Sequence, residues 1–257
     1  EEAGRGMFSA YLGELANDMI LLRQANFRSD DLSSIWTKKT QAEIFSRLIS
    51  LQSRSDVRNF IRKNKPLFLL ALNGDPAFNL PVTFDFLPDC KIIYMVRRGI
   101  DVAYQIKEKK WLPSKQLTHP SHAKIYRSII YKSRIFYMPC WVESKDDKKF
   151  IEYSEYERGL FYWCVLVESA IKSLENLKEK KRYEIVKYEE LIKNPQKIMR
   201  EMGMFLNIKP SSAAGITKTA LRKIKNYQRI YRKAPKLPGE LLARTKALYK
   251  YLKYEWN

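Results

Sequence analysis

Two adjacent arginines, Arg97 and Arg98, stand where the sequence changes from one periodicity to another. Residues 92–96 form a run of β-branched and aromatic side chains that is typical of a strand buried on both faces. After Gly99 the apolar residues follow a helical spacing, and Asp101 places a carboxylate in the first turn, where the helix dipole favours it. Arginines at the carboxyl end of a buried strand, beside a helix N-terminus, would bind an anion such as a phosphate. The alternative is that both are ordinary surface arginines in a loop.

Three further side chains are candidates for acid–base chemistry. His119 and His122 are the only histidines of the chain, and a pair without a third ligand nearby is poor evidence for a metal, so we expect none. They lie in residues 112–149, where prolines interrupt the periodicity and aromatic residues cluster. This segment is either a lid or substrate insertion over the active site, or a surface loop. Asp75 lies in a strong turn signal, where capping of the turn is the alternative to a chemical role.

A glycine-containing segment, residues 4–6, leads into an apolar pattern with helical spacing over residues 7–15. Such a loop can hold a phosphate on backbone N–H groups, although no Gly-Lys-Ser/Thr of a Walker motif follows and a plain helix lead-in is the alternative. The sequence opens like the end of a loop. We expect either that upstream residues, including a first strand, are missing, or that this strand is absent.

The elements that must position these residues alternate along the chain. Apolar runs predict strands, and amphipathic spacing predicts helices. The order predicts one α/β domain with a mainly parallel central sheet and helices on both faces, joined by right-handed crossovers. The predicted strands are residues 19–22, 67–72, 92–96 and 183–188. The predicted helices are residues 7–15, 41–53, 56–63, 100–107, 155–177, 189–191, 196–206 and 238–254.

The composition indicates which kinds of ligand and which cellular location to expect. The 257 residues carry a formal charge of +20, from 48 Lys and Arg against 28 Asp and Glu, which attracts anionic small molecules and polyanions without specifying a nucleic acid. Three widely spaced cysteines indicate neither a disulfide framework nor a zinc site. No apolar run is long enough for a membrane span, and no signal peptide is visible, so we expect a cytoplasmic protein. A luminal domain cut from a membrane anchor is the alternative.

Two segments carry a resemblance to a known family. KIIYMVRRGIDVAYQ resembles the strand-loop-helix with which the PAPS-dependent sulfotransferases bind the 3′-phosphate of their cofactor. YEIVKYEELIKNPQKIMREMGMFLNI resembles, at the right spacing, that family's downstream strand, Tyr-Glu motif and helix ending in a Phe-Leu-Gly-like turn. The resemblance implies a P-loop NTPase-like sulfotransferase fold over a single domain, residues 1–257. It also implies transfer of a sulfuryl group from 3′-phosphoadenylyl sulfate (PAPS) to a hydroxyl or amine, with 3′,5′-ADP as product and no metal.

The resemblance assigns cofactor-binding roles. Arg97 falls on the family arginine that contacts the 3′-phosphate, and Gln105 falls where the family has a serine. Tyr188 and Glu189 are expected to be structural and to fix a strand-to-helix turn. The remaining cofactor-binding positions are those of the phosphosulfate loop, Arg5, Gly6 and Ser9, and those of the basic segment that closes over the 3′-phosphate, Arg229, Arg232 and Lys233.

The catalytic half of the site departs from the family. Sulfuryl transfer needs positive charge at the leaving phosphate and a base for the acceptor's proton. The usual lysine is replaced by Gly74, and none of residues 24–26 is the usual glutamate. The remaining candidates are Arg5 for the leaving group, and Asp75, His119 or His122 as the base.

Two other functions stay open. A catalytically inactive, sulfotransferase-like protein could bind nucleotide or a polyanion through its basic surface. A nucleotide kinase or other P-loop enzyme would need a Gly-Lys-Ser/Thr loop, which the chain lacks. For a sulfotransferase we expect a small-molecule or carbohydrate acceptor, and the sequence leaves open carbohydrate, small alcohol, lipid and peptide tyrosine.

Overall fold

The computed structural model describes residues 45–46, 49–64, 80, 90–124, 126–176, 182–207 and 233–256. The chain divides into two compact units, residues 1–73 and 74–257. Several predicted features lie outside the described residues: the strands 19–22 and 67–72, positions 24–26 and 74, and the candidate residues Arg5, Gly6, Ser9, Asp75, Arg229 and Arg232. The prediction of a single domain stays a prediction.

In the first unit the structure describes the helix α3, Arg54–Asn64. It begins two residues before the predicted helix 56–63 because Ser53 and Asp56 cap each other. The backbone N–H of Ser53 donates to Asp56 Oδ2 over 2.8 Å, and the N–H of Asp56 donates back to Ser53 Oγ over 3.2 Å. This reciprocal pair satisfies two N–H groups that the first turn would otherwise leave without partners.

In the second unit, two strands form a parallel pair. β1, Ile92–Val96, pairs with β4, Tyr183–Lys187, in a register that sets Ile92 opposite Tyr183 and Val96 opposite Lys187. The predicted parallel arrangement is therefore confirmed for these two strands. Because parallel strands point the same way, their carboxyl ends meet at one edge of the sheet. The residues that follow each strand thus come out side by side.

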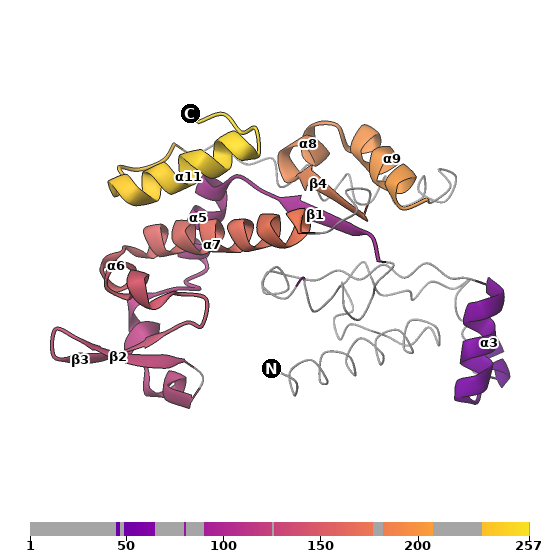
Figure 1. The fold of residues 1–257 in the computed structure, drawn as a ribbon, viewed down its shortest axis with the longest axis horizontal. Coiled ribbons are helices and arrows are strands. Elements are labelled where there is room, and N and C mark those ends of the chain that lie inside the picture. Colours follow the sequence, from indigo (N-terminus) through magenta and orange to yellow (C-terminus); the bar gives the residue numbers. More distant parts are fainter. Residues whose placement is uncertain are drawn as a thin grey trace. The chain divides into compact units, whose positions relative to one another are not determined.

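Three helices build the main core of this unit (Figure 1). They are α5, Gly99–Glu108, α7, Glu155–Glu175, and α11, Gly239–Tyr251. Small residues let α5 lie very close to α7, because a Cβ on Gly159 would come within 3.2 Å of the backbone of Ala103. The side chains buried in this core include Ile100, Leu160, Trp163, Cys164, Val167, Leu248 and Tyr249.

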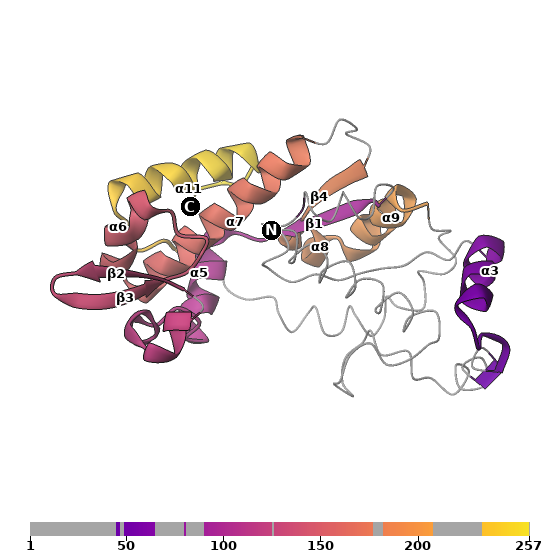
Figure 2. The ribbon, with the colours of Figure 1, turned by 60° about the horizontal axis from the view of Figure 1, so that its bottom comes forward.

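The parallel pair packs one of its faces on the second half of α7. There Tyr94 of β1 and Ile185 of β4 lie against the buried residues Ala170 and Leu174. After β4 the chain forms α8, Tyr188–Lys193, and α9, Pro195–Phe205. Figures 1 and 2 show the β1–β4 pair toward one end of α7 and a separate β-hairpin at the other end.

Residues 112–149, for which the sequence predicted no regular elements, contain this hairpin. β2, Arg127–Tyr131, and β3, Arg134–Met138, are antiparallel and are joined by a two-residue turn. Lys132 and Ser133 have φ angles of 48° and 59°, as a type I′ turn requires, but the sequence lacks the Asn-Gly pair that usually marks one. The other elements of the segment are the short 3-10 helices Ser114–Thr118, Pro120–Lys124 and Ser144–Asp146 and the start of α6, Asp147–Glu152.

The segment is attached to α7 through a buried arginine. Arg158 is 1% exposed, and its guanidinium donates to the carbonyls of Leu112 and Tyr153 and to Ser114 Oγ, over 3.0, 2.5 and 2.7 Å. Burial lowers the pKa of this guanidinium. Arg158 thus fixes the point where residues 112–149 begin. Whether the rest of the segment acts as a lid stays a prediction.

None of the helices in the described ranges is long and apolar enough to cross a membrane. Cys90, Cys140 and Cys164 carry free thiols, and burial raises the pKa of Cys164 to about 12.

Candidate functional site

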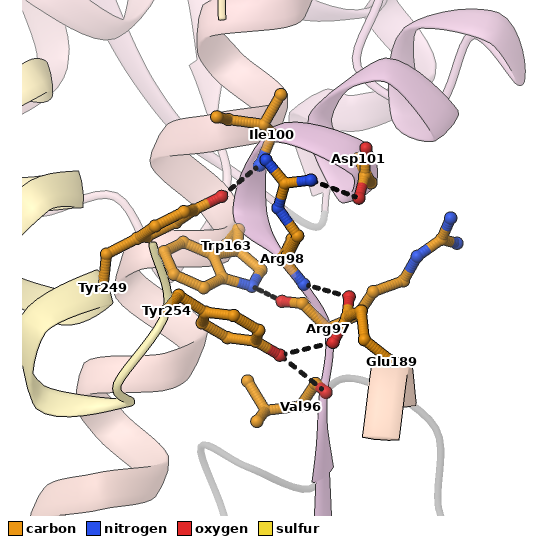
Figure 3. Close-up of polar contacts among 9 residues, drawn as sticks. All are labelled: Val96, Arg97, Arg98, Ile100, Asp101, Trp163, Glu189, Tyr249 and Tyr254. Carbon is orange, nitrogen blue, oxygen red and sulfur yellow. Dashed lines mark hydrogen bonds and ion pairs between the residues drawn. The ribbon is translucent and has the colours of Figure 1, made fainter. Parts of the chain in front are cut away.

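Side chains distant in the sequence contact the backbone of the turn between β1 and α5 at Val96, Arg97, Arg98 and Ile100 (Figure 3). The four contacts are Tyr254 Oη to Val96 O at 3.2 Å, Trp163 Nε1 to Arg97 O at 2.9 Å, Arg98 N to Glu189 Oε1 at 2.9 Å, and Ile100 N to Tyr249 Oη at 3.2 Å. The backbone N–H groups of Arg98 and Ile100 are therefore already used as donors. An anion at this turn would depend on side chains more than on the helix N-terminus.

The side chain of Arg98 is part of the interior. The residue is 4% exposed, and Nη1 lies 4.0 Å from Oδ2 of Asp101, whose side chain is 11% exposed. A pair of opposite charges that is removed from water must stay together, since separating them would leave a buried charge uncompensated. Arg98 is therefore not an ordinary surface arginine of a loop, and its charge is offset by Asp101.

Arg97 points the other way. In Figure 3 its side chain leaves the network of the turn, while that of Arg98 runs toward Asp101. The half-buried guanidinium of Arg97 donates through Nη1 to Gln105 Oε1 over 3.1 Å, and its central carbon lies 5.2 Å from the centroid of the Tyr188 ring. No carboxylate of the described residues forms an ion pair with Arg97. Its orientation is thus fixed, and donors remain for an external acceptor.

Gln105 lies two turns along α5 and completes this pair. Its Oε1 faces Arg97, so its amide N–H groups are also donors available on the same side of the helix. The structure therefore brings together Arg97 and Gln105, as the sequence predicted. A guanidinium and an amide that share one hydrogen bond form a donor group suited to a phosphate oxygen.

The chain returns to α5 at Lys233, which is exposed. Its carbonyl oxygen accepts a hydrogen bond from Tyr104 Oη over 3.3 Å, one residue before Gln105. The Tyr104 ring packs on that of Tyr156, with centroids 4.7 Å apart, and burial raises the pKa of the Tyr156 phenol. The end of the predicted basic segment thus lies against α5, the helix that carries Gln105.

The described contacts of the two histidines are made with residues close to them in the sequence, beyond the C-terminal end of α5, and none of these contacts is with Arg97 or Gln105. His119 Nδ1 lies 2.7 Å from Ser121 Oγ, and the ring of His122 meets that of Tyr126 edge-on at 4.9 Å. Across the described ranges, no group of three or more His, Cys, Asp or Glu side chains could hold a metal ion.

Sequence reasoning missed the residues that hold the turn. Trp163 fell inside the predicted helix 155–177 without a role at the turn, and Tyr254 fell at the end of the predicted helix 238–254. Glu189 was expected to fix its own strand-to-helix turn, yet it binds the turn after β1. The available signal was chemical: buried Trp and Tyr side chains usually find partners for their N–H and O–H groups.

Comparison with protein families bears on the identity of this site. The pattern described as "Sulfotransferase domain" matches residues 76–232, which is more than half of the chain. The chain belongs to the sulfotransferase domain family. Both segments that carried the resemblance lie within the matched residues, and so do Arg97, Gln105 and Glu189.

Two solved sulfotransferase structures are similar to this sulfotransferase chain. The "Sulfotransferase Domain from the Curacin Biosynthetic Pathway" is 14% identical, with a TM-score of 0.48, over 97% of this chain and 79% of that one. The sulfotransferase from Alicyclobacillus acidocaldarius is 12% identical, with a TM-score of 0.34, over 87% of this chain and 74% of that one. No curated protein matches the chain. The family assignment rests on the domain match.

Proposed function

We propose that this protein is a PAPS-dependent sulfotransferase in which Arg97 and Gln105 bind the 3′-phosphate of the nucleotide. Sulfuryl transfer to a hydroxyl or amine then releases 3′,5′-ADP. The observation that carries the proposal is the state of Arg97: a half-buried guanidinium at the carboxyl end of a parallel strand, held by Gln105 and Tyr188, without a carboxylate partner in the described part of the chain.

The chemistry of the donors fits a phosphate monoester. A dianionic phosphate has three oxygens that each accept hydrogen bonds, and guanidinium is the cation that meets them with two parallel N–H groups. Asp101, the acidic group in the first turn of α5, opposes binding little, because the charge of Arg98 lies 4.0 Å away and offsets that of its carboxylate. The positive end of the α5 dipole adds a favourable field.

Nucleotide binding by the purified chain tests the anchoring half of the proposal. Calorimetry with 3′,5′-ADP and with 5′-AMP separates the 3′-phosphate from the rest of the ligand. We expect 3′,5′-ADP to bind at least ten times more tightly, since charge-assisted hydrogen bonds are worth about 1.5–3 kcal/mol each. Equal affinity for the two nucleotides would mean that the site does not recognise a 3′-phosphate.

Transfer of labelled sulfate from PAPS tests the catalytic half. A panel of acceptors should include a carbohydrate, a small alcohol, a lipid alcohol and a tyrosine peptide. Labelled product from any of them supports the enzyme, and the acceptor that reacts identifies the substrate class.

A catalytically inactive nucleotide-binding protein is the second candidate. Gly74 stands where related enzymes have a lysine, and residues 24–26 contain no glutamate. Tight binding of 3′,5′-ADP without transfer to any acceptor would favour this candidate.

A further inference from the structure

The C-terminal end of the described chain turns back onto the phosphate site. α11 ends at Tyr251, and Lys253 then adopts a left-handed φ of 54°. The N–H of Tyr254 donates to the carbonyl of Tyr249 over 2.8 Å, and the N–H of Lys253 donates to that of Lys250 over 3.2 Å. These two bonds are those of a Schellman turn, which reverses the chain after a helix. The turn directs Tyr254 toward the carboxyl ends of β1 and β4.

Two side chains, those of Tyr249 and Lys187, contact the ring of Tyr254 there. Its ring lies 5.4 Å from that of Tyr249, and Lys187 at the end of β4 lies 4.9 Å from its ring centroid. The ammonium of Lys187 also donates to the carbonyl of Lys253 over 2.7 Å. The phenol has one definite position as a result, at the base of the turn that precedes α5 (Figure 3).

The phenol meets the carboxylate that holds this turn. Tyr254 Oη lies 2.7 Å from Glu189 Oε2, while Glu189 Oε1 accepts the backbone N–H of Arg98 over 2.9 Å. A hydroxyl has one hydrogen, and the charged, nearer oxygen of Glu189 is a stronger acceptor than the carbonyl of Val96 at 3.2 Å. Burial and the adjacent Glu189 carboxylate raise the pKa of Tyr254, so the phenol stays a donor at neutral pH.

We propose that Tyr254 is a positioning residue for the phosphate site: its hydroxyl orients Glu189, whose carboxylate fixes the backbone of Arg98 and so sets the direction in which Arg97 projects. The proposal rests on the proposed function, because it assumes that Arg97 binds a 3′-phosphate. The contacts run from Tyr254 to Glu189, from Glu189 to the N–H of Arg98, and from there through the peptide bond to Arg97, the preceding residue. None of these groups needs to touch the nucleotide.

Two substitutions distinguish positioning from simple support of the fold. Tyr254→Phe keeps the ring and its packing and removes the hydroxyl. Glu189→Gln keeps an oxygen that can accept from Arg98 N–H, and its amide N–H can donate to the Tyr254 hydroxyl. Tyr251→Phe is the matched control, since Tyr251 lies on α11 and its hydroxyl donates over 2.7 Å to Glu175, at the end of α7.

Calorimetry with 3′,5′-ADP and 5′-AMP provides the first measurement. We expect Tyr254→Phe to weaken the binding of 3′,5′-ADP about fivefold, because one hydrogen bond is lost. The affinity for 5′-AMP should change little. Glu189→Ala should weaken the binding of 3′,5′-ADP more than Tyr254→Phe does. Glu189→Gln should keep most of the wild-type affinity for 3′,5′-ADP. Tyr251→Phe should leave both nucleotides unchanged. The proposal would be overturned if Tyr254→Phe lost affinity for both nucleotides to the same extent. It would also be overturned if Tyr254→Phe and Tyr251→Phe bound the nucleotides with equal affinities.

Hydrogen–deuterium exchange of the free protein provides the second measurement and needs no ligand. Tyr254→Phe should speed exchange in a peptide that spans residues 97–104, and Tyr251→Phe should not. If the wild-type chain does not bind 3′,5′-ADP, the proposed function is wrong, and exchange alone then decides whether Tyr254 orders the turn. Unchanged exchange in Tyr254→Phe counts against the inference even if the nucleotide binds.

Discussion

The indole of Trp163 packs directly against Gly99, so that a Cβ added at Gly99 would lie 2.6 Å from Cε3 of the ring. The same indole donates through Nε1 to the carbonyl of Arg97. Gly99 is thus the residue that lets Trp163 of α7 reach the backbone of the turn between β1 and α5. The glycine at the first position of α5 is needed because a side chain there would overlap the Trp163 ring, and not because of an unusual φ.

Gly99→Ala should lower both stability and nucleotide affinity. The added methyl group must displace the buried Trp163 ring, and overpacking of this kind costs about 1–3 kcal/mol. Urea denaturation and calorimetry with 3′,5′-ADP measure the two effects. Gly239→Ala is the control, since a Cβ there meets no atom within 4 Å at the start of α11. If the two variants behave alike, the contact with Trp163 is not important.

Arg97→Ala should weaken the binding of 3′,5′-ADP by about ten- to a hundredfold, because the lost hydrogen bonds are charge-assisted. The affinity for 5′-AMP should change little, because these hydrogen bonds are made to the 3′-phosphate alone. Arg134→Ala controls for the general loss of positive charge, since Arg134 is an exposed arginine on the β-hairpin. Nucleotide titrations of both variants provide the comparison. Equal weakening of the two nucleotides by Arg97→Ala would remove Arg97 from the 3′-phosphate site.

Much of the site's framework could be predicted from local pattern. The β-branched run of residues 92–96 gave the bounds of β1 correctly, and the helical spacing after Gly99 identified α5. The long apolar stripe predicted α7 over residues 155–177, two residues past its end at Glu175. These elements depend on short-range periodicity, which a single sequence contains.

The residues that orient the turn could not be predicted in this way. Glu189 lies 91 positions from Arg98 in the sequence, and no local pattern encodes such a pairing. The final helix was predicted to reach Tyr254 but ends at Tyr251, because Lys253 takes a left-handed φ without the glycine that usually marks a helix end. A backbone reversal that relies on tertiary contacts leaves no stop signal in the sequence.

Lys110→Gly should stabilise the protein by about 0.5–1 kcal/mol. Lys110 follows α5 with a φ of 52°, where an L-residue with a Cβ is strained and glycine is not. Thermal or urea unfolding of the variant measures the gain. Lys109→Gly provides the opposite control, since Lys109 has a right-handed φ of −81° and should lose stability through added backbone entropy in the unfolded chain. Destabilisation by both glycines would show that the turn is not strained at Lys110.

Arg158→Leu should destabilise the second unit by about 3 kcal/mol or more. The substitution removes a buried guanidinium and leaves two backbone carbonyls and the Ser114 hydroxyl without their partner, and each buried group left unsatisfied costs about 1–3 kcal/mol. Arg158→Lys should recover part of the loss, since an ammonium can reach some of these acceptors but cannot match the planar guanidinium.

Limited proteolysis shows where the effect of Arg158→Leu arises. Cleavage within residues 112–149 should become faster than cleavage elsewhere, because Arg158 fixes the entry to this segment through Leu112. The expected pattern distinguishes a rigid insertion from a lid that opens by itself. If the segment already opens freely in the wild-type protein, Arg158→Leu should change neither its cleavage rate nor the midpoint of unfolding.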